Sequence, residues 1–400
     1  MQLDFNGKKA LVRVDFNVPL DAEHQVTDDN RIRAALPTIR HILDQGGAAI
    51  LMSHLGRPQK KRKEDGSIDR EKFSLRYVVE PLSELLSLPV QFAESTVGED
   101  ARAKAEALEP GQVLLLENTR FQAEEEKGDE HFARQLAELG DVYVNDAFGS
   151  AHRAHASTTV VAQYFEPEQR DFGFLLKSEL EHAQKLMEDT SKPFVAIIGG
   201  AKVSDKIQLL DSLLQQVDHL LIGGGMAYTF LKAQGGEVGK SLVEEDKLDL
   251  ALELLAQARQ KGVTVHLPED SIIADAFANE AEHRQANSKS IPDGWMGLDI
   301  GERARNAFRT VILDARRILW NGPMGVFEMP NFAEGTKAVA QAVADATTQG
   351  AFSLVGGGDS VAAVNQLGLA AAISYVSTGG GAMLELLEGK ALPGVAALED

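Results

Sequence analysis

The chain contains 400 residues, 44% of them hydrophobic, which is more than one ordinary core holds, so we expect two domains. Its 60 acidic and 40 basic residues give a net charge of -20, which argues against a nucleic-acid or membrane partner. The lack of cysteine excludes disulfides and thiolate metal sites, and no apolar run is long enough to cross a bilayer. We therefore expect a soluble, cytoplasmic protein.

Short apolar runs alternate with longer segments of helical period, which is typical of repeated βα units and parallel sheets. The predicted strands, in chain order, are residues 10–14, 48–52, 113–116, 142–144, 194–198, 219–222, 263–267, 317–320, 352–355 and 373–376. They are too many for one sheet of ordinary size, so two sheets are expected. Between residues 165 and 192 the strand pattern gives way to a charged amphipathic segment. We interpret that segment as a helix joining the two sheets.

In the first half of the chain, arginine and histidine follow the predicted strands or open the first helix. These residues are Arg31, His54, Arg57, Arg120 and Arg153. The carboxyl ends of parallel strands meet at one edge of a sheet, where ligands bind. Forked guanidinium donors suit phosphate and carboxylate oxygens, so this edge is predicted to bind an anion. His152 and His155 are interpreted as packed or solvated rather than catalytic.

In the second half, glycine follows the strands, in residues 199–206, 223–228, 321–328, 356–360 and 377–382. Glycine lets backbone amides approach a ligand closely, and a helix that begins there adds its positive end. Repeated turns of this kind predict a phosphate site. No Walker motif, no G-x-G-x-x-G motif and no eukaryotic-type kinase set occurs. The run of basic residues 60–63 is interpreted as a solvated loop.

The chain contains, in this order, VRVDFNVP, RIRAALP, SHLGRP, ENTRF, NDAFGSAHRAHAS, GGAKVSDKI, WNGPMGVFE, GGGDS and STGGGA. In this order and at these spacings, the segments resemble those of the phosphoglycerate kinase family over essentially the whole chain. The resemblance implies an α/β fold with two Rossmann-like three-layer domains, each with a mainly parallel sheet. It implies a triose domain at residues 1–170, a nucleotide domain at 171–385, and a segment at 386–400 that returns to the first domain. The hinge is expected within residues 172–186.

The resemblance also implies which residues bind each ligand. The triose site would contain Asp15, Asn17, Arg31, His54, Arg57, Arg120 and Arg153. The nucleotide site would contain Gly200, Ala201, Lys206, Gly224, Gly225, Gly297, Asn321, Glu328, Gly356, Gly357, Gly358, Asp359 and Ser360. Asp359 would coordinate Mg²⁺, and the catalytic residues would be Arg31, Lys202 and Lys206. Ser360 stands where threonine is common in the family, and it keeps the hydroxyl.

The implied reaction moves a phosphoryl group reversibly between 1,3-bisphosphoglycerate and MgADP, giving 3-phosphoglycerate and MgATP, in a protein expected to be a monomer. The acceptor is a carboxylate, which is already ionised at neutral pH, so no general base is needed. The enzyme then has to position the reactants for in-line transfer and neutralise the charge on the transferring group. Domain closure would exclude water. Arg31, Lys202 and Mg²⁺ on Asp359 suit that task. Glu328 suits ribose hydroxyls better than phosphate, which its charge would repel.

Two alternatives remain at this point. Another acyl-phosphate kinase, acting on acetate or aspartate, would not need so many arginines, because its substrate lacks a second phosphate. A non-catalytic nucleotide-binding scaffold would have no reason to keep a metal-binding acid together with its flanking cations. Arg31, Lys202, Lys206 and Asp359 therefore argue against the scaffold.

Overall fold

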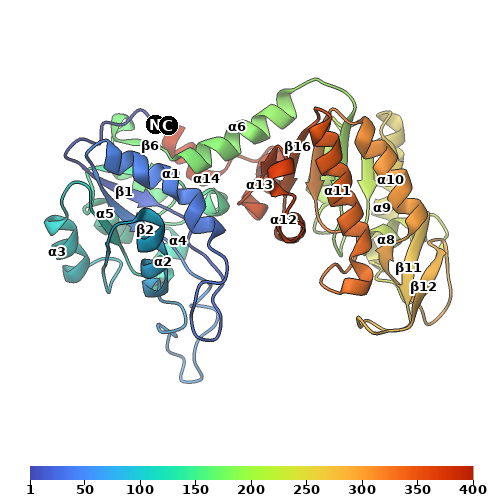
Figure 1. Ribbon diagram of the computed structural model, residues 1–400, viewed down its shortest axis with the longest axis horizontal. Coiled ribbons are helices and arrows are strands. Elements are labelled where there is room, and N and C mark those ends of the chain that lie inside the picture. The colour runs from blue at the N-terminus through green and yellow to red at the C-terminus, as the bar shows by residue number, and fades with distance from the viewer. Residues whose placement is uncertain (400) are drawn as a thin grey trace. The chain divides into compact units, whose positions relative to one another are not determined.

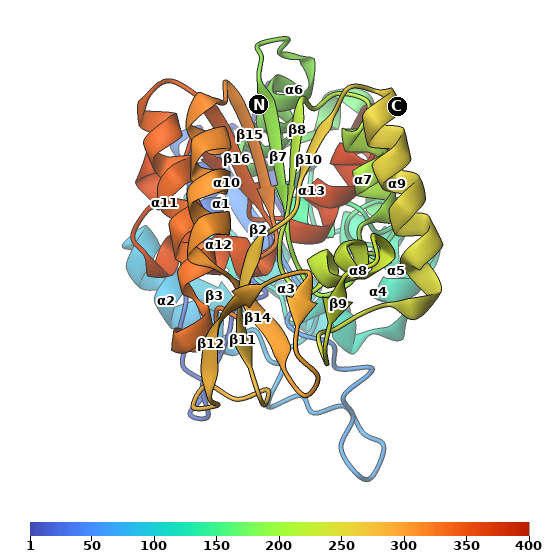
Figure 2. The same cartoon turned by 90° about the vertical axis from the view of Figure 1, so that its right-hand side faces the viewer.

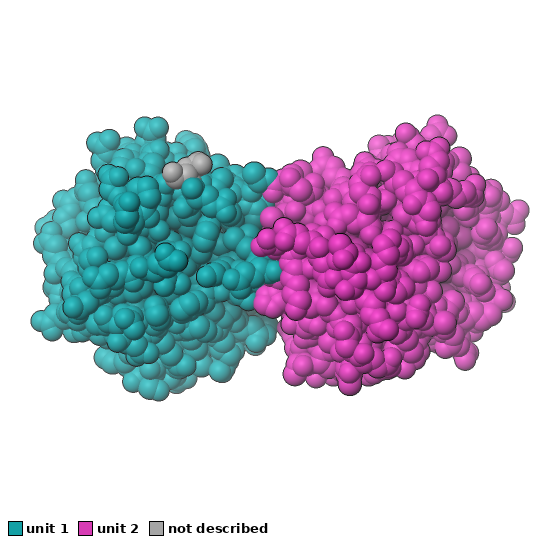
Figure 3. All heavy atoms as spheres, turned by 90° about the horizontal axis from the view of Figure 1, so that it is seen from above, with its two compact units in different colours: residues 1–181, 391–400 teal, residues 182–390 magenta. Residues whose placement is uncertain are grey.

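The computed structural model describes residues 1–399, and the chain divides into two compact units (Figure 3). Unit 1 comprises Met1–Glu181 and the end of the chain from Ala391 onward, and unit 2 comprises His182–Lys390. Each unit contains a six-stranded sheet in which every strand pairs in parallel with its neighbours. The expected α/β fold with two mainly parallel sheets is confirmed. No helix in the described residues is long and apolar enough to span a membrane.

In unit 1 the strand order is β3 (Val90–Phe92), β4 (Val113–Leu115), β2 (Ala48–Met52), β1 (Lys9–Arg13), β5 (Val142–Asn145) and β6 (Arg170–Phe172). Helices α1 (Asn30–Asp44) and α2 (Arg76–Leu86) pack on one face of the sheet (Figure 1). On the other face lie α3 (Glu99–Ala107) and α5 (Glu130–Ala137). Alternate residues of a strand point to opposite faces of the sheet. Val12 therefore packs in the core with α1 and α2, and Leu11 packs in the core with α3 and α5.

In unit 2 the strand order is β10 (Thr264–His266), β8 (His219–Ile222), β7 (Phe194–Ile198), β15 (Arg317–Asn321), β16 (Phe352–Gly356) and β17 (Tyr375–Val376). The helices of this unit are α7 (Ile207–Leu213), α8 (Met226–Ala233), α9 (Leu248–Gln260), α10 (Glu302–Asp314), α11 (Glu334–Thr348), α12 (Gly358–Gln366) and α13 (Gly380–Leu387). The buried face of α10 and that of α11 share one hydrophobic core with β7 and β15. Trp320 is fully buried in that core.

Unit 2 also contains two small sheets that were not predicted. One is antiparallel, with β11 (Asp270–Ala274) between β12 (His283–Asn287) and β14 (Met296–Ile300), and it lies apart from the six-stranded sheet (Figure 2). The other pairs β9 (Glu237–Val238) with β13 (Ser290–Ile291). Four of the five residues of β12 are polar and exposed, so this strand carries no apolar pattern that sequence reasoning could detect.

The unit boundaries differ from the expected limits at residues 170 and 385. Strand β6 pairs with β5, so residues 170–172 form a strand of the first sheet instead of continuing into a helix. Helix α6 (Phe174–Glu188) then begins in unit 1 and ends in unit 2, where the His182 ring stacks on Tyr375 with centroids 4.0 Å apart. Near the other limit, the carbonyl oxygen of Leu387 accepts a 2.9 Å hydrogen bond from Ser212, which keeps α13 in unit 2.

The remaining helices complete unit 1. Helix α4 (Ala123–Lys127) precedes α5, and α14 (Pro393–Glu399) comes from the end of the chain. The backbone N–H of Gly394 donates to the Ala151 carbonyl at 2.8 Å, and the Asn145 side chain donates to the Gly394 carbonyl at 3.2 Å. These bonds attach the end of the chain to the loop that follows β5. That loop carries Arg153, one of the arginines expected at the anion-binding edge.

Candidate active site

The turn after β7 and the turn after β15 adjoin in unit 2, because β7 and β15 are neighbours in the sheet. From β7 the strand order continues to β8 on one side and to β15 on the other, which makes this position a topological switch point. Ligands of open parallel sheets bind at such points, beyond the carboxyl ends of the strands. The turns after β7 and β15 are among those for which the sequence predicts a phosphate site.

A cavity of about 450 Å³ opens at this point. Seven of the residues expected at the nucleotide site line it: Gly200, Ala201, Gly224, Gly225, Gly297, Glu328 and Asp359. Gly224 has a φ of 70°, and a Cβ there would lie 2.6 Å from the Gly200 carbonyl oxygen. Only glycine therefore allows the turns after β7 and β8 to approach each other so closely.

The other expected nucleotide residues are tied to one another at the ends of β15 and β16. The Lys206 ammonium donates a hydrogen bond to the Asn321 side-chain oxygen, and Asn321 donates in turn to the Gly356 carbonyl at 3.0 Å. Burial lowers the pKa of Lys206, and the charges of Asp205, Glu388 and Asp359 act in the opposite direction. The buried Ser360 hydroxyl accepts a 2.6 Å hydrogen bond from the Gly322 N–H, so it braces the turn after β15.

Asp359 lies in the first turn of α12, whose N-cap is Gly357. Its carboxylate is exposed and borders the cavity. Within residues 1–399, no three histidine or acidic side chains gather to hold an ion. A single carboxylate fits Mg²⁺ that arrives with a nucleotide, because Mg²⁺ takes one or two carboxylates and fills its remaining positions with phosphate oxygens and water. Lys202 is exposed in the turn after β7.

Sequence reasoning missed the residues that give the cavity its apolar wall, which include Tyr228, Leu242, Phe277 and Met296. Phe277 is 63% exposed, which is unusual for a large apolar side chain. It suits a flat aromatic ligand such as a nucleotide base. These residues come from α8, from loops and from the unpredicted strand β14, so no motif in the chain order brings them together.

In unit 1 the corresponding switch point lies between β1 and β5, which are neighbours in the sheet. The Arg31 guanidinium is 2.6 Å from the Asp15 carboxylate. Asp15 also accepts the backbone N–H of Asn17 at 3.2 Å, and the Asn17 side-chain oxygen accepts the N–H of Gly56 at 2.8 Å. These bonds join three segments that sequence reasoning selected separately.

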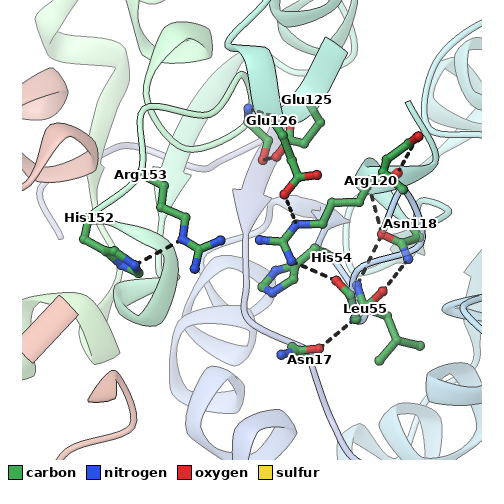
Figure 4. A network of polar contacts seen from close by, with 12 residues as sticks. Asn17, His54, Leu55, Asn118, Arg120, Glu125, Glu126, His152 and Arg153 are labelled. Carbon is green, nitrogen blue, oxygen red and sulfur yellow. Dashed lines mark hydrogen bonds and ion pairs between the residues drawn. The ribbon is translucent and has the colours of Figure 1, made fainter. Parts of the chain in front are cut away.

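Cations gather around His54, which is only 5% exposed (Figure 4). Burial holds the pKa of His54 well below its usual value, and the charges of Arg120, Arg13 and Arg31 add to that effect. Burial also lowers the pKa of Arg120 to about 10. Arg120 donates to the Gly56 carbonyl at 2.8 Å, and its Nε lies 3.9 Å from the Glu126 carboxylate. The site is therefore strongly electropositive.

Arg153 completes this group from the loop after β5. Its Nε lies 3.1 Å from Nε2 of His152 (Figure 4). The charge of Arg153 is among the causes that lower the pKa of Arg120. Burial lowers the pKa of His155 to about 3, so His155 and His54 are both neutral imidazoles at neutral pH, each with one N–H group. Arg57 is exposed, and its carbonyl accepts the N–H groups of Lys60 and Lys61. The contacts of its backbone do not place its side chain in the group.

Arg13 is a member of the group that sequence reasoning missed. It is fully buried on β1, where it donates to the Ser157 hydroxyl at 2.7 Å and lies 3.2 Å from Nδ1 of His54. Ser157 donates in turn to Glu125 at 2.5 Å. The sequence does contain a signal, because an arginine in the apolar strand ALVRV must find polar partners when it is buried.

A larger hollow of about 610 Å³ borders Asn17 and Gly56 in unit 1. Its charged lining is mostly acidic, with Asp21, Asp69 and Glu71 beside Lys72. Such a lining does not suit an anionic ligand. The arginine group is therefore the better anion site of this unit, although the hollow is larger.

A glycine-lined cavity at the switch point of one parallel sheet and an arginine group at that of another are typical of a kinase with two substrate sites. The fold and the two sites thus define a phosphotransferase with a two-unit α/β architecture.

Comparisons with known proteins assign the family. The family model described as phosphoglycerate kinase matches residues 1–390. The chain is 51% identical to phosphoglycerate kinase of Porphyromonas gingivalis, over 100% of this chain and 99% of that protein. It is 56% identical to that of Moorella thermoacetica, over 100% and 98%. The solved structure of phosphoglycerate kinase from Coxiella burnetii matches with a TM-score of 0.85 at 41% identity, covering 99% of this chain and 97% of that chain. The chain belongs to the phosphoglycerate kinase family and is a glycolytic phosphotransferase.

Proposed function

We propose that this chain transfers a phosphoryl group reversibly from 1,3-bisphosphoglycerate to ADP, giving 3-phosphoglycerate and ATP. The observation that carries the proposal is the arginine group of unit 1. Arg13, Arg31 and Arg120 surround a neutral histidine, and Arg153 extends the positive field. A substrate with both a carboxylate and a phosphate would use several guanidinium groups, whereas acetate would leave most of them unpaired.

In this proposal the triose ligand is bound by Asp15, Asn17, Arg31, His54, Arg57, Arg120 and Arg153. The nucleotide is bound at the cavity of unit 2 by the turns after β7, β8 and β16, by Gly297, and by Glu328 through the ribose hydroxyls. Asn321 and Ser360 support the turns that line the cavity, because Asn321 donates to the Gly356 carbonyl and Ser360 accepts from the Gly322 N–H. Lys206 contacts Asn321 beside these turns.

His54 and His155 are neutral, so they are poor cationic partners for phosphate and serve as hydrogen-bond donors instead. The reaction does not need a base, because a carboxylate oxygen is already deprotonated at neutral pH. We propose that Arg31, Lys202 and Lys206 neutralise the charge that spreads over the transferring group. Mg²⁺ held by Asp359 and the nucleotide phosphates would contribute additional positive charge.

The two ligand sets belong to different units, so we propose that transfer requires the units to close about α6, which also excludes water. The radius of gyration should then fall when both substrates bind. An unchanged value with both ligands bound would count against closure in solution.

A coupled assay tests the function directly. ATP, Mg²⁺ and 3-phosphoglycerate are supplied with a dehydrogenase that consumes 1,3-bisphosphoglycerate and NADH, and parallel reactions contain acetate or aspartate in place of 3-phosphoglycerate. Turnover with 3-phosphoglycerate alone supports the proposal. Turnover with acetate or aspartate, read through release of ADP, would favour another acyl-phosphate kinase. Binding of MgADP without turnover of any acid would favour a scaffold.

A further inference from the structure

Two histidines meet at the edge of the large sheet of unit 2. His219 is the first residue of β8, and His266 is the last residue of β10, the edge strand. In the parallel register Thr264 stands beside His219. Side chains alternate along a strand with a period of two, so His266 projects to the same face as Thr264 and hence as His219. The backbone therefore brings the two imidazoles together.

The two rings are in direct contact. Nδ1 of His219 lies 3.1 Å from Nε2 of His266, the ring centroids are 5.2 Å apart, and the planes are tilted by 42°. Both residues are only half-buried, so solvent and ions reach the pair. Burial and the neighbouring His219 lower the pKa of His266, which favours the neutral imidazole that binds metals.

The spacing of the nitrogens matches that of two adjacent ligands on one ion. Imidazole nitrogen binds Zn²⁺ at about 2.0–2.1 Å, and two such bonds at an angle of about 100° place the nitrogens about 3.1 Å apart. Without an ion, the N–H of one ring must donate a hydrogen bond to the unprotonated nitrogen of the other. Binding requires that the donating ring move this proton to its other nitrogen, which frees a lone pair without displacing either strand.

We propose that His219 and His266 form a chelating site for one divalent transition-metal ion, of the class of Cu²⁺ and Zn²⁺, with water completing its coordination. Imidazole nitrogen favours these ions, whereas Mg²⁺ prefers oxygen ligands, so the site differs in chemistry from Asp359. The neighbouring Asp218 is engaged elsewhere: its carboxylate accepts hydrogen bonds from Lys192 and from the Phe194 N–H. The ion would join the edge strand β10 to β8.

Titration of metal-free protein with Cu²⁺, followed by calorimetry and electron paramagnetic resonance, tests the site. We expect one tight equivalent whose spectrum shows coupling to two nitrogens. His219→Asn and His266→Asn should each weaken this binding at least about tenfold, because a chelate becomes a single ligand. His131→Asn is the matched control, since His131 is exposed on α5 of unit 1. It should leave the binding unchanged.

A second readout does not depend on copper. Zn²⁺ should raise the melting temperature of the wild-type protein by binding the native state, and it should do so less for His266→Asn. Mg²⁺ alone should give no difference between the two proteins. Melting without metal shows first that each variant is folded, and His266→Gln replaces any variant that is not. Equal Cu²⁺ affinity in the wild type and in both histidine variants, or equal Zn²⁺ stabilisation, would overturn the proposal.

Discussion

Nη2 of Arg13 lies 3.2 Å from Nδ1 of His54. A guanidinium has only donors, so Nδ1 of His54 must accept, and the ring proton must lie on Nε2. Burial and the surrounding arginines keep the ring neutral by holding its pKa well below the usual value. His54 is therefore a neutral donor of fixed tautomer.

The first prediction concerns this tautomer. His54→Gln keeps one acceptor for Arg13 and one donor, so 3-phosphoglycerate binding should weaken by less than about tenfold. His54→Leu should weaken this binding further, because leucine provides neither group. Because the native ring does not titrate near neutrality, the wild type and His54→Gln should show the same dependence of kcat/KM on pH between 6 and 8. A limb with a pKa near 6.5 in the wild type that disappears in the variant would contradict this assignment.

Arg31 provides the second prediction. Arg31→Ala should lower kcat on the order of 100- to 1000-fold while leaving the affinity for MgADP unchanged, because its proposed partner is the transferring group. Arg31→Lys keeps the charge near Asp15 and should recover part of the activity. Steady-state kinetics and calorimetry separate the two effects. An unchanged kcat would remove Arg31 from the mechanism.

The third prediction concerns the carboxylate of Asp359. Asp359→Asn should weaken MgADP binding about tenfold or more, whereas 3-phosphoglycerate binding should remain nearly intact, because that ligand is assigned to unit 1. ADP titrated in the presence of a chelator is the control, and it should bind the two proteins with similar affinity. If calorimetry showed both substrates weakened equally, a structural role for Asp359 would be the better explanation.

Two adjacent glycines allow a matched comparison. Gly357 has a φ of 92°, and a Cβ there would lie 2.8 Å from the Asn321 side chain, whereas a Cβ on Gly358 would meet nothing within 4 Å. Gly357→Ala should therefore destabilise unit 2 by about 1–3 kcal/mol. Gly358→Ala should leave stability within about 0.5 kcal/mol and weaken ADP binding, because its methyl group would occupy the proposed phosphate position. Unchanged ADP affinity in Gly358→Ala would argue against the cradle.

The fifth prediction is a dependence of stability on pH. Burial raises the pKa of Asp146 to about 7, although hydrogen bonds from Thr38 and from the backbone of Leu176 and Leu175 act in the opposite direction. The unfolded carboxyl titrates near 3.9, so the folded state holds its proton more tightly. The tighter binding of this proton by Asp146 therefore stabilises the folded state fully below about pH 4, and this stabilisation is lost as the pH rises through 7. Asparagine does not titrate, so Asp146→Asn should not lose stability over this pH range. At pH 8 its free energy of unfolding should exceed that of the wild type.

Circular dichroism or hydrogen exchange should follow this transition in unit 1. Both tryptophans, Trp295 and Trp320, lie in unit 2, so their fluorescence reports on the other unit. A difference in stability between the wild type and Asp146→Asn that stays constant from pH 5 to pH 8 would contradict the raised pKa.

Much of the fold could be predicted because buried parallel strands are continuous apolar runs. All ten predicted strands are present, and the segments at 48–52, 194–198 and 219–222 agree with β2, β7 and β8 in both bounds. The misses have physical reasons. Strand β12 is polar because it is exposed, and β6 is only three residues long, with a charged composition that resembles the helix that follows it.

The sequence by itself determined where the ten apolar strands of the two large sheets lie, which residue types follow them, and the family whose motifs they form. Those properties are local, since they depend on apolar runs and on turn chemistry. Only the tertiary structure decided which strand ends meet. Arg13 and Ser157 are 144 positions apart, yet they share a hydrogen bond because β1 lies beside β5 in the sheet. The neutral state of His54, the apolar wall around Phe277 and the contact of His219 with His266 arise in the same way, from burial and strand order that no local pattern encodes.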